Sequence, residues 1–140
     1  MEWPRFKNKN SGPSTKAVGD AAEDAALAHL LAAGLRLVAR NFRTPGRGGG
    51  EIDLIMREPG GTLVFVEVRR RASASHGGAA ASVGATKQRR IVFAARHFLM
   101  RLPQVPPCRF DVVLVQGDAN SHPALPALDW IRAAFDAGDA

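Results

Sequence analysis

The stretch that decides the fold of this chain is EIDLIMREPGGTLVFVEVRRR, residues 51–71. Side chains that alternate between two faces flank EPGGT, a sequence typical of a turn, and this pattern predicts two antiparallel strands joined as a hairpin. Three acids, Glu51, Asp53 and Glu67, occupy positions where a half-buried sheet usually carries apolar side chains. These three acids are therefore the first candidates for a functional site.

The expected register brings two of these acids together. Pairing that is symmetric about Gly60 places Asp53 opposite Glu67. The same register places Glu51 opposite Arg69. Opposed residues have Cβ atoms about 4.5–5.5 Å apart, where two ionised carboxylates repel by on the order of 3 kcal/mol at an effective dielectric constant near 20. A shared proton, a neighbouring cation or a metal ion would relieve this repulsion, and a structural network in which Arg69 neutralises Glu51 is the alternative.

The carboxylate pair predicts a metal site. Mg²⁺ commonly takes one or two carboxylates, keeps several waters and takes other ligands from substrate phosphates. We therefore expect metal-assisted phosphodiester hydrolysis, with Asp53 and Glu67 as ligands of Mg²⁺ or Mn²⁺. Glu23 lies four residues before Leu27, in line with the apolar stripe of the first expected helix. It is a candidate third acid, and extension into solvent at the helix start is the alternative.

The basic residues of the chain are concentrated in one region. The formal net charge is +6, and nine Lys and Arg residues but no acid lie between Val68 and Phe110. Such a field attracts polyanions, of which nucleic acid is the commonest and anionic lipid an alternative. The residues predicted to bind nucleic acid are Arg43, Arg47, Arg70, Arg71, Lys87, Gln88, Arg89 and Arg90.

The length of 140 residues predicts one domain. We expect residues 1–15 to be a disordered basic segment and residues 16–140 to form the domain. The expected element order is helix, three strands, helix, strand, helix, which suits a mixed sheet flanked by helices. The helices are expected near residues 16–34, 87–102 and 127–136. The strands are expected at residues 35–42, 51–56, 63–69 and 109–116.

Other features bear on the compartment. The lone cysteine, Cys108, rules out an internal disulfide, which fits a reducing environment. No apolar run reaches the roughly 20 residues that a membrane-spanning helix needs. The N-terminal sequence MEWPRFKNKNSGPSTK lacks the apolar region of a secretory signal. These features predict a cytoplasmic protein without a membrane partner.

Five segments, in this order, resemble the YraN-like family of bacterial proteins. They are GEIDLIM from Gly50, VFVEVRRR from Val64, GGAAASV, the KQ pair at residues 87–88, and CRFDVV from Cys108. That family is similar to the restriction-endonuclease-like superfamily, and its first helix and hairpin resemble those of archaeal Holliday junction resolvases. The resemblance implies a restriction-endonuclease-like α/β fold and Mg²⁺-dependent cleavage of DNA, including branched or structured DNA. Resolvase-like relatives act as symmetric dimers, so a homodimer is left open.

The superfamily motif PD-(D/E)xK implies catalytic roles one residue at a time. Its Asp matches Asp53, its second acid matches Glu67, and its Pro position holds Ile52. Glu23 matches the helix acid of the resolvase-like members. The Lys position holds Arg69, and arginine stabilises charge but does not readily release a proton. The catalytic residues that the resemblance implies are Glu23, Asp53, Glu67 and Arg69.

The arginine at position 69 leaves several readings open. The metal ion could activate the attacking water, or Lys87 could reach the site from its helix. A protein that binds nucleic acid without cleaving it is the second functional hypothesis. A module whose basic surface binds an acidic partner protein is the third.

Overall fold

The computed structural model describes residues 15–71, 83–116 and 127–137. Its helices are α1, Thr15–Ala32, and α3, Ala85–Leu99. Its strands are β1 (Arg36–Arg43), β2 (Glu51–Arg57), β3 (Leu63–Arg71), β4 (Cys108–Gln116) and β5 (Leu128–Phe135). The predicted disordered segment, except Thr15, and most of the GGAAASV segment lie outside the described residues.

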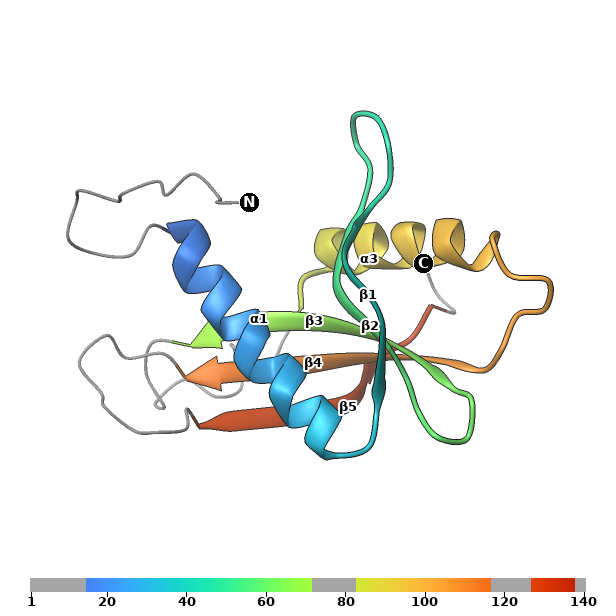
Figure 1. Ribbon diagram of the computed structural model, residues 1–140. Coiled ribbons are helices and arrows are strands. Elements are labelled where there is room, and N and C mark those ends of the chain that lie inside the picture. The colour runs from blue at the N-terminus through green and yellow to red at the C-terminus, as the bar shows by residue number, and fades with distance from the viewer. Residues whose placement is uncertain (1–14, 72–82, 117–126, 138–140) are drawn as a thin grey trace, which may run out of the picture.

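The five strands form one mixed sheet in the order β1-β2-β3-β4-β5. The first three strands make the predicted antiparallel meander, and the chain then crosses through α3 to place β4 parallel to β3. The helices lie on opposite faces of the sheet, α1 on one and α3 on the other (Figure 1). The predicted mixed α/β architecture is confirmed. Neither described helix is long and apolar enough to cross a membrane.

The end of α1 follows from a glycine in the sequence. Gly34 has a φ of 100°, a left-handed conformation that costs glycine little. The Leu35 N–H donates to the Leu30 carbonyl at 3.1 Å, and the Gly34 N–H donates to the Leu31 carbonyl at 3.0 Å. This pair of bonds is the Schellman motif, which satisfies carbonyls that a helix end would otherwise leave exposed.

Each face of the sheet has its own apolar core. On one face, Ala26 and Leu30 of α1 pack on alternate residues of the central strands, which include Val64, Val66 and Val113. On the other face, Ile91 and Phe98 of α3 pack on the intervening strand residues, which include Phe65, Phe110 and Val112. Strand alternation therefore assigns even-numbered residues of β3 to the α1 face and odd-numbered residues to the α3 face.

The helix predicted near residues 127–136 is wrong, because this segment is strand β5. Val112 of β4 pairs with Ile131, whereas Phe110 pairs with Phe135, so β5 contains extra residues around Ala133. Ala133 has a φ of 51°, as expected where a bulge bends a strand. Ile131 and Phe135 pack against the same core, and because residues four apart share a face in a strand as well as in a helix, this spacing does not distinguish the two.

Candidate functional site

Strands β2 and β3 separate at the carboxylate pair. The predicted hairpin register is confirmed, and its last pair is Leu54 with Val66. Asp53 and Glu67 follow at the next position on each strand, where the ladder has ended. There Oδ2 of Asp53 accepts a hydrogen bond from the Val68 N–H at 2.8 Å. A side chain thus replaces a backbone acceptor, and the strands open around it.

The separation changes which face β2 presents. Regular alternation along β2 would place Ile52 on the same face as Leu54 and Met56, and the structure departs from it at Ile52. Leu54 and Met56 pack in the α1 core, but Ile52 packs in the α3 core. On the neighbouring strand, Asn41 has a φ of 54° at the same level, a conformation that Asn tolerates better than most residues. Beyond this point the β1–β2 ribbon rises alongside α3 (Figure 1).

Glu67 is the unusual residue of the pair. It is only 7% exposed, and Nζ of Lys87 lies 3.5 Å from its Oε2. Its Oε1 is buried and, written as a carboxylate, accepts no hydrogen bond from the described residues. Burial, followed by the negative charge of Asp53, raises the pKa of Glu67 to about 8, while Lys87 opposes the rise. Near neutral pH this carboxyl therefore holds a proton.

Asp53 shares the same environment. Burial raises its pKa, and the hydrogen bond from the Val68 N–H lowers it in part. A hydrogen bond between the two carboxyl groups favours the proton on Glu67 over Asp53. The apo pair thus relieves its repulsion by sharing a proton, one of the means expected from the sequence.

The pair also fits a divalent metal ion of the kind predicted. Among the residues that the structure describes, no three His, Cys, Asp or Glu side chains are grouped to hold a metal. Mg²⁺ needs no such group, because it binds through one or two carboxylates and completes its shell with water and phosphate oxygens. The Glu67 Oε1 atom, buried and without a donor among the described residues, is an oxygen ligand of the required type. Asp53 and Glu67 are the residues that would hold the ion.

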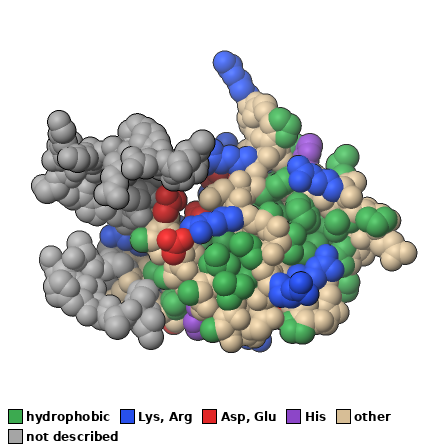
Figure 2. Space-filling model, in the orientation of Figure 1, with side chains coloured by type: hydrophobic (Ala, Val, Ile, Leu, Met, Phe, Trp, Pro, Cys, Tyr) green, Lys and Arg blue, Asp and Glu red, His purple; other side chains and the backbone are tan. Residues whose placement is uncertain are grey.

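Glu23 of α1 lies near this pair but has partners of its own. The Arg40 Nε lies 3.2 Å from Glu23 Oε1, and the Asn41 amide, oriented to satisfy its surroundings, donates to both carboxylate oxygens at 3.3 Å. Burial raises the pKa of Glu23, the Arg40 hydrogen bond lowers it, and repulsion from Asp53 raises it further. Acidic and basic side chains gather in one area of the face in Figure 2. Sequence reasoning missed Arg40 and Asn41, although an Asn inside a strand is a signal for left-handed backbone.

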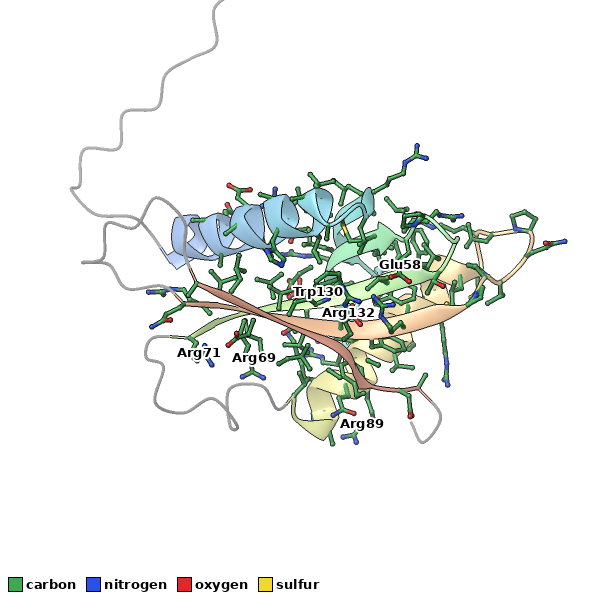
Figure 3. The ribbon with its side chains drawn as sticks, turned by 90° about the horizontal axis from the view of Figure 1, so that it is seen from below. Glu58, Arg69, Arg71, Arg89, Trp130 and Arg132 are labelled. Atoms are coloured by element: carbon green, nitrogen blue, oxygen red, sulfur yellow. The ribbon has the colours of Figure 1, made fainter. Side chains whose placement is uncertain are left out.

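Arg69 and Lys87 approach the pair from different elements. A hollow of about 430 Å³ is lined by Glu67, Val68, Arg69, Arg70, Gly84 and Lys87. Figure 3 shows Arg69 on the α3 side of the sheet, at the opposite end from Glu58. A guanidinium from β3 and an ammonium from α3 therefore border one space beside the buried carboxyl. The sequence predicted Lys87 as a nucleic-acid contact, and the structure also makes it the ion-pair partner of Glu67.

The predicted position of Glu51 opposite Arg69 is wrong. Glu51 pairs in the sheet with Arg43 of β1, and Nε of Arg43 lies 3.0 Å from its Oε2. The reason is the separation at Asp53, which carries the start of β2 away from β3 with β1 alongside it. Arg43 rather than Arg69 is thus the strand neighbour and the ion-pair partner of Glu51.

The remaining predicted nucleic-acid contacts differ in how available they are. Arg47 and Arg70 are exposed, and Arg90 is exposed beside the β1–β2 connection. Arg71 is only 12% exposed in its side chain and pairs with Asp129 at 2.8 Å. Two others bond within their own neighbourhood: Gln88 donates to the Val83 carbonyl at 2.7 Å, and Arg89 donates to Thr86 Oγ1 at 3.2 Å.

Comparison with known proteins places the chain in a family. The model of the Uncharacterised protein family UPF0102 matches residues 22–115, more than half of the chain. The chain belongs to this family. The UPF0102 match begins within α1 and ends within β4, so it includes Glu23, the β2–β3 hairpin and Lys87. The predicted YraN-like membership is confirmed at this level.

Individual UPF0102 proteins are similar along nearly their whole length. The UPF0102 protein of Paracidovorax citrulli (strain AAC00-1) is 64% identical over 140 residues, covering 95% of this chain and 98% of that protein. That of Albidiferax ferrireducens is 64% identical over 137 residues, covering 98% and 99%. That of Cupriavidus taiwanensis is 56% identical over 125 residues, covering 89% and 87%. Their names give the family and no activity.

Proposed function

We propose that this UPF0102 protein is a metal-dependent endonuclease that hydrolyses phosphodiester bonds of DNA. The observation that carries the proposal is the convergence of Asp53 and Glu67 where β2 and β3 separate, with a buried carboxylate oxygen of Glu67 that no described residue donates to. Oxygen ligands of this kind suit Mg²⁺ or Mn²⁺, and the basic residues around them suit a phosphate backbone. The relation to the restriction-endonuclease-like superfamily belongs to the same proposal.

The chain's own residues divide the work between binding and charge stabilisation. Asp53 and Glu67 would hold the ion, which supplies Lewis-acid polarisation of the phosphate and a water of lowered pKa when bound. Arg69 would contact the scissile phosphate and stabilise the charge that develops on it. Arg69 cannot readily release or accept a proton. Lys87, whose Nζ lies at the carboxyl pair, provides an amine that can. Glu23 would act through Asp53, because the negative charges of the two side chains repel each other.

A second candidate is a nucleic-acid-binding protein that does not cleave. One observation favours it: the motif lysine is replaced by Arg69. Both candidates use the same basic surface, so DNA affinity alone does not separate them. A homodimer and a cytoplasmic location remain predictions under either one.

The two candidates are separated by a cleavage assay. Purified protein is incubated with supercoiled plasmid, linear duplex and four-way-junction DNA in Mg²⁺, in Mn²⁺ and in EDTA. Asp53→Asn and Glu67→Gln remove one ligand charge each with little change of shape. Asp24→Asn is the matched control, because Asp24 is an exposed acid paired with Arg40. The proposal requires metal-dependent cleavage by the wild type and by Asp24→Asn, and none by the other two.

Two outcomes count against the endonuclease. Cleavage that survives both Asp53→Asn and Glu67→Gln must come from another protein in the preparation. DNA binding without cleavage in either metal, on all three substrates, establishes the non-cleaving candidate instead.

A further inference from the structure

A second hollow of about 430 Å³ lies between the β1–β2 connection and the first turns of α3. We call it the glycine hollow, because four of its lining residues are glycines between Gly46 and Gly50. Gly46 and Gly48 have φ values of 87° and 70°, so the connection turns through conformations that favour glycine. With no side chains there, peptide groups form much of the wall, and backbone N–H groups are donors suited to anions.

The shape of the glycine hollow is fixed by close contacts. A Cβ atom on Gly50 would lie 1.9 Å from the Arg90 carbonyl oxygen, so only glycine lets β2 approach α3 this closely. A Cβ on Gly49 would lie 2.2 Å from Thr44 Oγ1. The Gly50 N–H donates to that hydroxyl at 2.8 Å, and the Thr44 N–H donates to the Gly50 carbonyl at 3.0 Å. The hollow is therefore formed before any ligand binds.

The charge of the glycine hollow points to an anion. Its lining includes three basic residues, Arg43, Lys87 and Arg90, and one acid, Glu51. Glu51 forms an ion pair with Arg43 at 3.0 Å, so the positive charges of Lys87 and Arg90 are in excess in the lining. Among the described residues that line it there is no aromatic or large apolar side chain, so a nucleobase would meet no aromatic ring there. The ligand that fits is a phosphate rather than a base.

Lys87 connects the two hollows. It lines the glycine hollow and also the space that contains Glu67 and Arg69. We infer that the glycine hollow binds a phosphate of the nucleic-acid strand next to the linkage held at Asp53 and Glu67, an inference that rests on the proposed function. Arg90 is the residue that would distinguish this subsite, because it lines the glycine hollow and not the other one.

The test uses binding without metal, so that it does not depend on cleavage. The affinity of a fluorescein-labelled single-stranded oligonucleotide is measured in EDTA at several NaCl concentrations. Arg90→Ala should weaken binding about tenfold and reduce the slope of log K against log salt by about one phosphate contact. Arg96→Ala is the matched control, since Arg96 is an exposed arginine of α3 outside both hollows. Glu51→Gln should tighten binding, because it removes the hollow's acid.

The outcomes are distinct. Equal effects of Arg90→Ala and Arg96→Ala would mean diffuse attraction and would overturn the subsite. Inorganic phosphate, followed by ³¹P NMR, should bind the wild type, compete with the oligonucleotide and lose affinity in Arg90→Ala. If phosphate binds without competing with the oligonucleotide, the hollow binds free phosphate, and the inference that it binds a phosphate of the nucleic-acid strand is refuted. Cleavage unchanged in Arg90→Ala refutes only the subsite, whereas Arg90-dependent binding without cleavage refutes only the proposed nuclease.

Discussion

Two buried acidic clusters lie on neighbouring strands and differ in how fully they are satisfied. Asp111 of β4 is completely buried and accepts hydrogen bonds from Arg109 Nε at 2.9 Å and Nη2 at 3.0 Å, from Trp130 Nε1 at 2.9 Å and from the Ala133 N–H at 2.9 Å. Glu67 of β3, when ionised, has a buried oxygen that accepts no hydrogen bond from the part of the chain that the structure describes, and its pKa is raised to about 8. The hydrogen-bonding capacity of Asp111 is thus met within the fold, whereas that of ionised Glu67 is not met by the described residues.

The difference separates structural from functional acids. The bonds of Asp111 join β4 to the bulge of β5, so its charge is used to hold an irregular edge strand. The charge of Glu67 is opposed by burial and by Asp53, which destabilises its ionised form. An unsatisfied buried group of this kind points to a ligand that supplies what the protein lacks.

The largest effect on stability should come from Asp111→Ala. It leaves the Arg109 guanidinium half-buried with Glu58 as its remaining ion-pair partner, and it leaves the donors of Trp130 and Ala133 unpaired. We expect a loss of about 3–5 kcal/mol in the free energy of unfolding, measured by urea denaturation. Asp24→Ala, at an exposed acid whose partner Arg40 also contacts Glu23, is the control and should cost little. Similar losses for both variants would contradict the assignment of Asp111 as a structural acid.

The next effect is on activity rather than stability. Glu67→Gln should reduce metal-dependent cleavage by more than about 100-fold, since even partners of metal ligands cost about 10–100-fold when removed. At pH 8 the same variant should be at least as stable as the wild type, because it removes a buried ionisable group. Cleavage rates and urea denaturation at pH 8 check both statements. A variant that loses stability as Asp111→Ala does would remove the contrast between the two acids.

The pH dependence of stability should differ between the wild type and Glu67→Gln. The pKa of Glu67 rises from an ordinary 4.5 to about 8 on folding, so between these values the folded protein binds more protons than the unfolded chain. The stability that Glu67 contributes is therefore fully present below about pH 4.5 and is lost as the pH rises toward 8. The melting temperature should fall across this window, and Glu67→Gln should flatten the slope. Mg²⁺ should stabilise the wild type more at pH 8 than at pH 6, because binding releases the proton.

The smallest effect should come from the exposed ion pair of Arg43 and Glu51, whose side chains are 72% and 42% exposed. A double-mutant cycle with Arg43→Gln and Glu51→Gln should give a coupling energy of about 0.2–1 kcal/mol that shrinks in high salt. A larger value, unaffected by salt, would place this pair with Asp111 among the structural contacts.

Local sequence was enough to predict the hairpin. The turn after Arg57 and the alternation on both sides specify the register, because a shift by one residue would exchange side chains between the two cores and turn the acids to the other face. The meeting of Asp53 and Glu67 followed from that register. The same local reasoning failed in β5, because Ile131 and Phe135, four residues apart, share a face in a strand as well as in a helix, and a register shift interrupts the alternation between them. Periodicity does not reveal an irregularity that depends on the neighbouring strand.

The sequence by itself determined the α/β class, the strand register, the family and the identity of the two central acids, all of which rest on spacing along one segment or on shared motifs. The tertiary structure decided which cation meets Glu67, since Lys87 arrives on a helix whose position depends on packing against the sheet. It also decided that Glu51 turns to Arg43 and that Gly50 lies against Arg90. Such contacts join residues on separate elements, and only the packed core fixes the distance between them.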